Sequence, residues 1–311
     1  MLKRTLFISN PCYISTRFEQ LVLKNKKTDE EKTVPIEDLG FVVFENGECT
    51  FSLQAISKLN ENNVAAIFCN DKHLPTSLLL NLDANDIQSQ LFSYQINAAE
   101  PLKKQLWQQT IKAKILNQAG VLQSLGIEIE TLKRCAANIK SGDTSNEEAK
   151  ASRYYWSRLF NYENLIVSLS RFNVELLVGF TRSRFGDPPN NLFNYGYAIL
   201  RAATARALAG SGLLPTLGIH HHNKYNAFCL ADDIMEPYRP FVDKLVYEII
   251  KEGTDYSTLT TPIKSRLLGL LTVDVQINNS TSPLMVGLSQ TTASLAECFK
   301  KKRKTIKYPS F

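Results

Sequence analysis

Short apolar runs separated by polar or glycine-containing turns occupy the first 80 or so residues of the chain. They cover residues 6–8, 13–15, 21–23, 40–44 and 64–68. Runs of this length that are rich in β-branched and aromatic residues and bounded by turn residues indicate strands. A short helix fits residues 52–59. The pattern therefore predicts a small, mainly β domain at the start of the chain.

From about residue 95 the apolar residues follow helical spacing instead, three and four positions apart. Examples are Leu102 with Leu106, Ile111 with Ile115, and the series Leu159, Tyr162, Ile166 and Leu169. We therefore expect an α+β protein, with a small, mainly β N-terminal domain followed by a larger all-α domain. The expected boundaries are residues 1–82 for the β-rich domain, 83–94 for a linker, 95–297 for the helical domain and 298–311 for a basic tail.

The net charge of +6 arises at the C-terminal end of the chain. Residues 298–311 hold six of the 36 basic residues and no acid, which leaves 36 − 6 = 30 basic against 30 acidic residues elsewhere. A basic segment attracts phosphate without regard to sequence. The tail is either a solvated, disordered end or an arm that contacts nucleic acid, and the sequence does not choose between the two.

Composition favours a folded cytoplasmic protein. Its 44% apolar content supplies a real core for about two domains. Six cysteines are scattered without CxxC spacing, as is typical of reduced thiols. We see neither the apolar region of a signal peptide nor the roughly 18 apolar residues of a membrane span, so we expect no membrane contact.

Three segments of the helical part carry groups suited to chemistry. In the first, a polar loop precedes a helix expected over residues 147–156. Ser145 and Glu148 have the spacing of a capping box, as do Thr144 and Glu147, and in such a box the glutamate only ties down the helix start. Considered alone, Glu148 is more simply a cap than a ligand.

The second segment leads to a run of three histidines. A turn at residues 187–191 starts a helix through Leu208, and its small residues allow another helix to approach closely. Residues 210–212, with two glycines, end that helix. The histidines at 220–222 follow, flanked by apolar residues, so we expect at least one of them to be functional.

The third segment is acidic. Asp232, Asp233 and Glu236 follow the histidines and can share one face of a helix, which Pro237 and Pro240 would kink or divide. Imidazole and carboxylate groups together are the usual ligands of a divalent metal. The alternative is a solvated acidic face in which Glu236 forms an ion pair.

Long, ordered motifs connect these segments. They are Glu148-x-x-Ala151 leading to Tyr155-Trp156, the stretch from Asp187-Pro188-x-Asn190 through Asn194-Tyr195-Gly196-Tyr197 to Arg201, and Leu217-Gly218-Ile219-His220-His221 followed by Asn226-x-Phe228-x-Leu230-Ala231-Asp232-Asp233-x-Met235-Glu236-Pro237-x-Arg239-Pro240. Together with residues 36–40 and 62–64, they resemble the CRISPR-associated protein 1 integrases of spacer acquisition, in their type II form. One departure is Ala149, where the family commonly has glycine.

The resemblance implies a metal site. Members of this family bind a divalent metal through two acids and a histidine, which correspond here to Glu148, His221 and Glu236. His220 and His222 would then lie around the metal or face DNA, and Asp233 would orient a ligand or hold metal-bound water. Two carboxylates and one imidazole favour Mg²⁺ or Mn²⁺.

The resemblance also implies the reaction and the partners. The family joins the 3′-hydroxyl ends of short double-stranded DNA fragments to the repeat array by metal-assisted transesterification, and water in place of the hydroxyl gives endonuclease activity. It implies a homodimer, formed through the β-rich domain, that pairs with CRISPR-associated protein 2. Basic residues near the motifs that could contact phosphate are Arg153, Arg182, Arg184, Arg201, Arg206 and Arg239.

Two other classes of function remain open. A zinc-dependent hydrolase would use histidines as its main ligands, yet His73 is the only histidine outside the run. A non-catalytic DNA-binding scaffold would need the basic residues but not the acids. Replacement of Glu148 or Glu236 separates the scaffold from the integrase.

Overall fold

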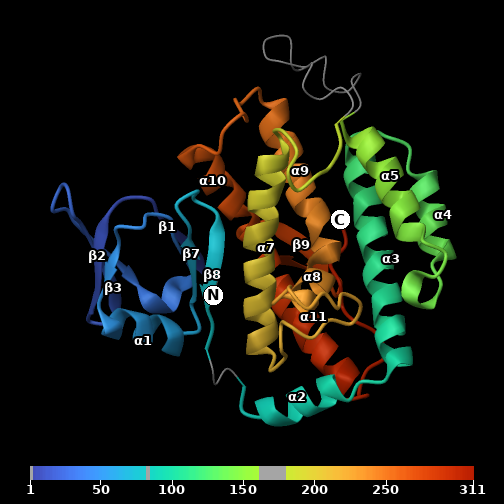
Figure 1. Ribbon diagram of the computed structural model, residues 1–311, viewed down its shortest axis with the longest axis horizontal. Coiled ribbons are helices and arrows are strands. Elements are labelled where there is room, and N and C mark those ends of the chain that lie inside the picture. Colours follow the sequence, from blue (N-terminus) through green and yellow to red (C-terminus); the bar gives the residue numbers. More distant parts are fainter. Residues whose placement is uncertain (1–2, 82–84, 161–179) are drawn as a thin grey trace.

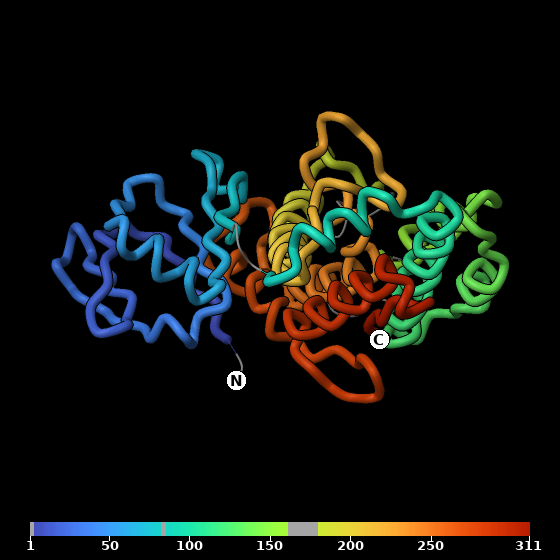
Figure 2. The backbone as a smooth tube through the Cα atoms, turned by 90° about the horizontal axis from the view of Figure 1, so that it is seen from below, coloured from blue at the N-terminus to red at the C-terminus, as the bar shows by residue number. Residues whose placement is uncertain are grey.

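The computed structural model describes residues 3–81, 85–160 and 180–311 (Figure 1). A β-rich N-terminal part lies beside a larger helical part, and the two follow one another along the longest axis of the molecule (Figure 2). The predicted α+β architecture is confirmed in this order. Tyr162, Ile166 and Leu169, which we expected on a helix, lie outside the described residues.

Two four-stranded sheets form the N-terminal part. The first has the order β1-β5-β7-β8, with β1 at Arg4–Ile8, β5 at Leu39–Phe44, β7 at Ala65–Cys69 and β8 at Pro75–Leu79. The second has the order β4-β3-β2-β6, with β2 at Cys12–Arg17, β3 at Gln20–Asn25, β4 at Glu31–Pro35 and β6 at Thr50–Phe51. A 3₁₀ turn, η1 at Ile36–Asp38, leads into β5, and the helix α1 at Leu53–Glu61 follows β6.

The continuous apolar run at 40–44 becomes the centre of the first sheet. All six residues of β5 are buried, and the strand pairs in parallel with both β1 and β7. Parallel strands covered on both faces read as unbroken apolar runs, which is why this strand was predictable. The helix α1 packs on these strands, and Ser52 caps it by accepting a hydrogen bond from the Ala55 N–H.

The helical part also contains a short β-hairpin, so the expected all-α domain is not entirely helical. Its elements are α2 (Gln88–Ile96), α3 (Glu100–Ser124), α4 (Glu130–Asn138), η2 (Ser141–Asp143), α5 (Glu147–Leu159), α7 (Asn190–Gly210), α8 (Cys229–Met235), η4 (Glu236–Tyr238), α9 (Arg239–Lys251), α10 (Thr261–Leu268), η5 (Gly269–Thr272), β9 (Asp274–Ile277), β10 (Ser280–Pro283) and α11 (Leu284–Phe299). The helix α2 begins inside the segment expected to be a linker.

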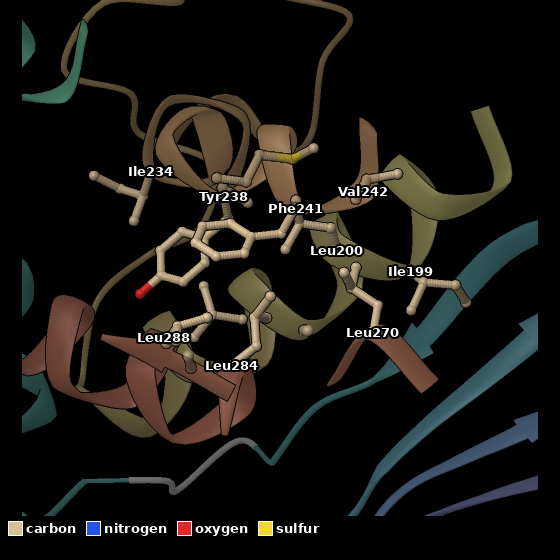
Figure 3. Packing of buried hydrophobic residues seen from close by; sticks show 14 of the residues in the cluster. Ile199, Leu200, Ile234, Tyr238, Phe241, Val242, Leu270, Leu284 and Leu288 are labelled. Carbon is tan, nitrogen blue, oxygen red and sulfur yellow. The ribbon is translucent and has the colours of Figure 1, made fainter. Parts of the chain in front are cut away.

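The helix α7 runs through the middle of the helical part (Figure 1). Its small residues allow the predicted close approach, because a Cβ atom added to Gly196 would lie 2.5 Å from the Cγ1 atom of Val242 on α9. Figure 3 shows the resulting core, to which α7, α8, η4, α9, η5 and α11 contribute. Residues that contribute to it include Ile199, Leu200, Ile234, Tyr238, Phe241, Val242, Leu270, Leu284 and Leu288. This core fixes the relative positions of α3, α7 and the α8–α9 junction.

The basic C-terminal segment packs onto the body of the protein, so the interpretation of a solvated, disordered end is wrong. Ile306 is buried, and the Tyr308 hydroxyl lies 2.7 Å from the Thr110 hydroxyl on α3. The carbonyl of Pro309 accepts a hydrogen bond from Asn117, also on α3. Apolar and aromatic residues within the basic run anchor it, while several of its lysines stay exposed.

All six cysteines are free thiols. In the part of the chain that the structure describes, no helix combines the length and the apolar composition that crossing a bilayer requires.

Candidate metal centre

Glu148 lies in the first turn of α5, and a different residue caps that helix. The carboxylate of Asp143 accepts hydrogen bonds from the backbone N–H groups of Glu147 and Glu148, at 2.9 and 3.0 Å. Asn146 stands at the N-cap in the left-handed conformation without a side-chain cap bond. The predicted capping boxes are therefore wrong, and the Glu148 side chain is released from the backbone for other contacts.

Glu236 lies at the junction of α8 and α9, where the prolines divide the acidic segment into separate turns as predicted. Pro237 occupies the first turn of η4 and Pro240 that of α9. Glu236 is only 3% exposed, so the interpretation of a solvated acidic face is wrong. Its Oε1 atom does form an ion pair with Arg239, at 3.1 Å. Burial opposes its charge, but Arg239 and Lys114 together lower the pKa of Glu236.

Lys114 of α3 joins the two glutamates. Its Nζ atom lies 2.6 Å from Oε1 of Glu148 and 2.7 Å from Oε2 of Glu236. Burial disfavours the ammonium, but the carboxylates of Glu236 and Glu148 overcome this and raise the pKa of Lys114. Sequence analysis did not single out this residue. The available signal was a lysine between Ile111 and Ile115, on a helix face expected to be buried.

The histidine loop is folded around one buried carboxylate. Asp233 of α8 is fully buried and accepts hydrogen bonds from the backbone N–H groups of Ile219, His220 and His221, at 2.7, 2.9 and 3.2 Å. A Cβ atom on Gly218 would lie 2.3 Å from the His221 carbonyl and 2.8 Å from Asp233 Oδ2. The loop therefore needs glycine at this position, for space rather than for backbone torsion.

The side chain of His221 is oriented by the same carboxylate. Its Nδ1 atom lies 2.5 Å from Asp233 Oδ1, and this hydrogen bond, with the charge of Asp233, raises the pKa of His221. Glu236 adds to the same effect. An imidazole that donates from Nδ1 keeps the lone pair of Nε2 for a ligand. Asp233 thus takes the orienting position that the family resemblance implied.

The other two histidines face elsewhere. The ring of His220 stacks on Trp107 of α3, with centroids 4.1 Å apart and planes 2° from parallel, and burial lowers its pKa. His222 is exposed, and His73 lies near Glu45 in the N-terminal part. Of the three histidines in the run, His221 is the one whose ring nitrogen bonds to an acidic side chain. Among the described residues, no group of three histidine, cysteine or acidic side chains that could hold a metal forms, so the histidine-rich ligand set of a zinc hydrolase is not present there.

The residues present suit a divalent cation by their chemistry. Glu148 and Glu236 already share one cation, the Lys114 ammonium, and His221 is close enough to Glu236 for the two charges to interact. Within residues 3–81, 85–160 and 180–311, no three acidic, histidine or cysteine side chains meet closely enough to hold a metal as they stand. The ammonium of Lys114 occupies the space between the two carboxylates.

A basic pocket of about 250 Å³ adjoins this cluster. Its lining includes Lys114, Arg182, Arg184 and Arg239. Arg182 bonds to Asn190, Asn194 and the Ser183 carbonyl, and Arg184 lies over the Phe185 ring. Among the described residues, neither of these two arginines forms an ion pair with an acid at contact distance, so both guanidinium groups are available to an anion in the pocket.

The remaining candidate arginines lie outside this pocket. Arg201 forms an ion pair with Asp232, and Arg206 donates to the carbonyl of Asn63. Arg153 is exposed on α5. The structure therefore gathers Arg182, Arg184 and Arg239 in the pocket beside Glu148 and Glu236. The other three candidate arginines lie outside this pocket.

One further acid lines the same pocket. Asp243 of α9 is buried and accepts hydrogen bonds from the hydroxyls of Tyr155 on α5, at 3.1 Å, and Tyr197 on α7, at 2.5 Å. Burial raises the pKa of Asp243 to about 7, although both tyrosines, Arg239 and Arg182 oppose the shift. Sequence analysis missed this residue because its partners lie on two other helices.

We expect Asp243 to make the stability of the protein depend on pH. Because its pKa rises from 3.8 to about 7 on folding, the folded state binds this proton more tightly. Its contribution to stability is therefore fully present below about pH 4 and is lost as the pH rises through about 7. The melting temperature of the parent should fall by a few degrees, relative to an Asp243→Asn variant, between about pH 5 and pH 8. If the melting temperatures of the parent and of Asp243→Asn change equally with pH, the raised pKa of Asp243 would be contradicted.

Comparison with known proteins identifies the family. A family model described as CRISPR associated protein Cas1 matches residues 6–258. The chain is 33% identical over 312 residues to the CRISPR-associated endonuclease Cas1 of Neisseria meningitidis serogroup C (strain 8013), covering 99% of this chain and 96% of that protein.

Solved structures share the fold. A casposase bound to integration product matches with a TM-score of 0.76 and 18% identity, over 98% of this chain and 92% of that chain. A chain of a Cas6-RT-Cas1–Cas2 complex matches with a TM-score of 0.68 and 20% identity, over 97% of this chain and 35% of that chain. With the family model matching most of its length and a curated relative matching nearly all of it, this chain belongs to the CRISPR associated protein Cas1 family.

Proposed function

We propose that this protein is a metal-dependent DNA integrase and endonuclease of CRISPR adaptation. The observation that carries the proposal is the pair of carboxylates, Glu148 and Glu236, sharing a cation beside a histidine that a buried aspartate orients. The basic pocket next to this pair suits the phosphates of a DNA strand. Membership of the Cas1 family, whose curated relative is named as an endonuclease, agrees with this chemistry.

The residues divide the work of the reaction among them. Glu148, Glu236 and His221 would hold Mg²⁺ or Mn²⁺, and such an ion stabilises the charge that builds on the oxygens of a phosphodiester under attack. Asp233 keeps the His221 ring in one orientation and one tautomer. Arg182 and Arg184, in the adjoining basic pocket, would attract DNA phosphates. Attack by a 3′-hydroxyl would form a new P–O bond and break the bond from the same phosphorus to the target strand's own 3′-oxygen, which leaves as a hydroxyl, so that two DNA molecules are joined. Attack by water breaks the same bond and cuts one strand. Neither reaction needs a covalent enzyme intermediate.

The proposed partners are double-stranded DNA, a second copy of this chain and CRISPR-associated protein 2. Two solved structures that share the fold support DNA and CRISPR-associated protein 2 as partners. One is a casposase whose structure is described as bound to integration product, and the other belongs to a Cas1–Cas2 complex. The homodimer rests on the family resemblance. A protein that acts on the repeat array is expected to be cytoplasmic. The six free thiols of this chain agree with that location.

A strand-transfer assay tests the function. The purified protein and its small partner would be mixed with Mn²⁺ or Mg²⁺, a short duplex with free 3′-hydroxyls, and a plasmid that carries a repeat array. We expect joined product with either metal and none after EDTA is added, because the developing negative charge is then left without its cation.

A duplex whose strands end in 2′,3′-dideoxynucleotides is the matched control, since it should bind equally but lacks the attacking oxygen. No joining by any duplex, in spite of tight DNA binding, would favour the scaffold. Joining that persists in EDTA would contradict the metal-dependent reaction.

A further inference from the structure

Lys114 occupies the position that a metal would need. Its ammonium contacts one oxygen of Glu148 and one of Glu236, at 2.6 and 2.7 Å, and its side chain is only 9% exposed. A divalent ion held by the same two carboxylates is smaller than an ammonium and binds carboxylate oxygens at shorter range. The two cations therefore compete for one space, and Lys114 has to move when a metal enters.

The charges of the cluster add to this competition. Glu148 and Glu236 supply two negative charges, and Lys114 and Arg239 supply two positive ones, so 2 − 2 = 0. A neutral cluster attracts a free divalent cation weakly. A bound divalent cation would bring the cluster to +2, and a phosphodiester brings one negative charge, so 2 − 1 = +1 when both are bound. Bound DNA therefore reduces the positive charge that the metal builds up in the cluster.

The displaced ammonium of Lys114 can move into the adjoining basic pocket. Lys114 also lines the basic pocket, together with Arg182, Arg184 and Arg239. Its four-carbon stem is flexible, and its ammonium can turn toward an anion in that pocket. Without DNA, the ammonium would enter a space that already holds three guanidinium groups and one acid, Asp243, whose negative charge is disfavoured because burial raises its pKa to about 7. A DNA phosphate removes this repulsion.

We propose that Lys114 couples the binding of the metal to the binding of DNA. It holds the two carboxylates together when neither ligand is present, and it releases them to a divalent cation when a phosphate takes up its ammonium. Lys114 is thus a positioning residue that makes the metal site selective for the DNA-bound state. This inference rests on the proposed metal ligands, Glu148 and Glu236.

The affinity for Mn²⁺, measured from the electron paramagnetic resonance signal of the free ion, tests the coupling. We expect a short duplex to tighten Mn²⁺ binding by the parent about tenfold, which lies within the usual range for coupled sites. Lys114→Met should bind Mn²⁺ about tenfold more tightly than the parent without DNA, and DNA should then add little. Lys112→Met is the matched control, because Lys112 is an exposed residue of the same helix, and it should behave like the parent.

The outcomes separate this inference from the function on which it rests. Equal Mn²⁺ affinities in the parent and Lys114→Met, or weaker binding by the variant, would overturn the coupling and leave Lys114 as a structural ion pair. No Mn²⁺ binding by the parent, with or without DNA, would overturn the proposed metal site itself. If Lys114→Met does not fold, Lys114→Gln removes the same charge with a polar side chain, and Mn²⁺ should raise its melting temperature more than that of the parent.

Discussion

Replacing Glu148 with glutamine is expected to abolish strand transfer while the fold stays intact. The side chain is 31% exposed and takes no part in capping α5, which Asp143 does, so its structural role is small. The lost carboxylate removes one of the two acidic ligands proposed for the metal. A bound metal contributes several kcal/mol of transition-state stabilisation, so we expect the rate to fall about a thousandfold.

Glu147→Gln provides a closely matched control for this prediction. Glu147 is the preceding residue of the same helix turn and pairs with Lys150 at 2.7 Å, away from Lys114. Strand-transfer rates should be measured for both variants beside melting temperatures, with the Glu147 variant close to the parent. Full activity of Glu148→Gln would mean that the reaction does not use this carboxylate, whereas equal inactivity of both variants would point to a folding effect.

Replacing Asp233 with asparagine is expected to destabilise the protein and to inactivate it. The carboxylate is fully buried and accepts from three backbone N–H groups and the His221 ring. An amide has a single acceptor oxygen, and its NH₂ group would face donors. Leaving buried donors without an acceptor should lower the free energy of unfolding by about 3 kcal/mol. Loss of the His221 orientation should also weaken Mn²⁺ binding.

Chemical denaturation measures this effect, with Asp232→Asn for comparison. Asp232 is also buried, but within the described residues it accepts from the side chains of Arg201, which is 42% exposed, and Asn226, and not from backbone N–H groups. These side chains can turn toward water when the charge is removed, so the expected loss is smaller, about 1 kcal/mol. If Asp233→Asn unfolds no more readily than Asp232→Asn, the carboxylate does not hold the histidine loop together in the way described.

Some strands were predictable from the sequence, and others were not. Residues 40–44 and 64–68 are apolar runs because both faces of β5 and β7 are covered, and these strands were predicted. The missed strands β4, β6 and β8 lie at sheet edges, and none of their residues is fully buried. Edge strands of this kind carry little hydrophobic pattern, because neighbours rather than burial hold them in place. The hairpin β9–β10 was missed inside a region of helical spacing.

The candidate site was only partly accessible from local patterns. The spacing around Glu148 predicted a capping box that does not form, and the family resemblance alone selected Glu148, His221 and Glu236 as ligands. The contacts that organise these residues come from Lys114 and Asp233, and they join different helices and a loop. Periodicity reports which face of a helix is buried, and it carries no information about which buried polar groups meet.

The position of Lys114 also has a consequence for the order of folding. Its contact with Glu236 joins residues that are 236 − 114 = 122 positions apart, and Asn117, one turn further along α3, bonds to the carbonyls of Pro237 and Pro309. Contacts that close such long loops form late, because their entropy cost precedes any gain from packing. During synthesis, a chain that has emerged only as far as α5 holds Glu148 and Lys114 but neither His221 nor Glu236. The proposed metal centre therefore assembles only after most of the helical part has folded.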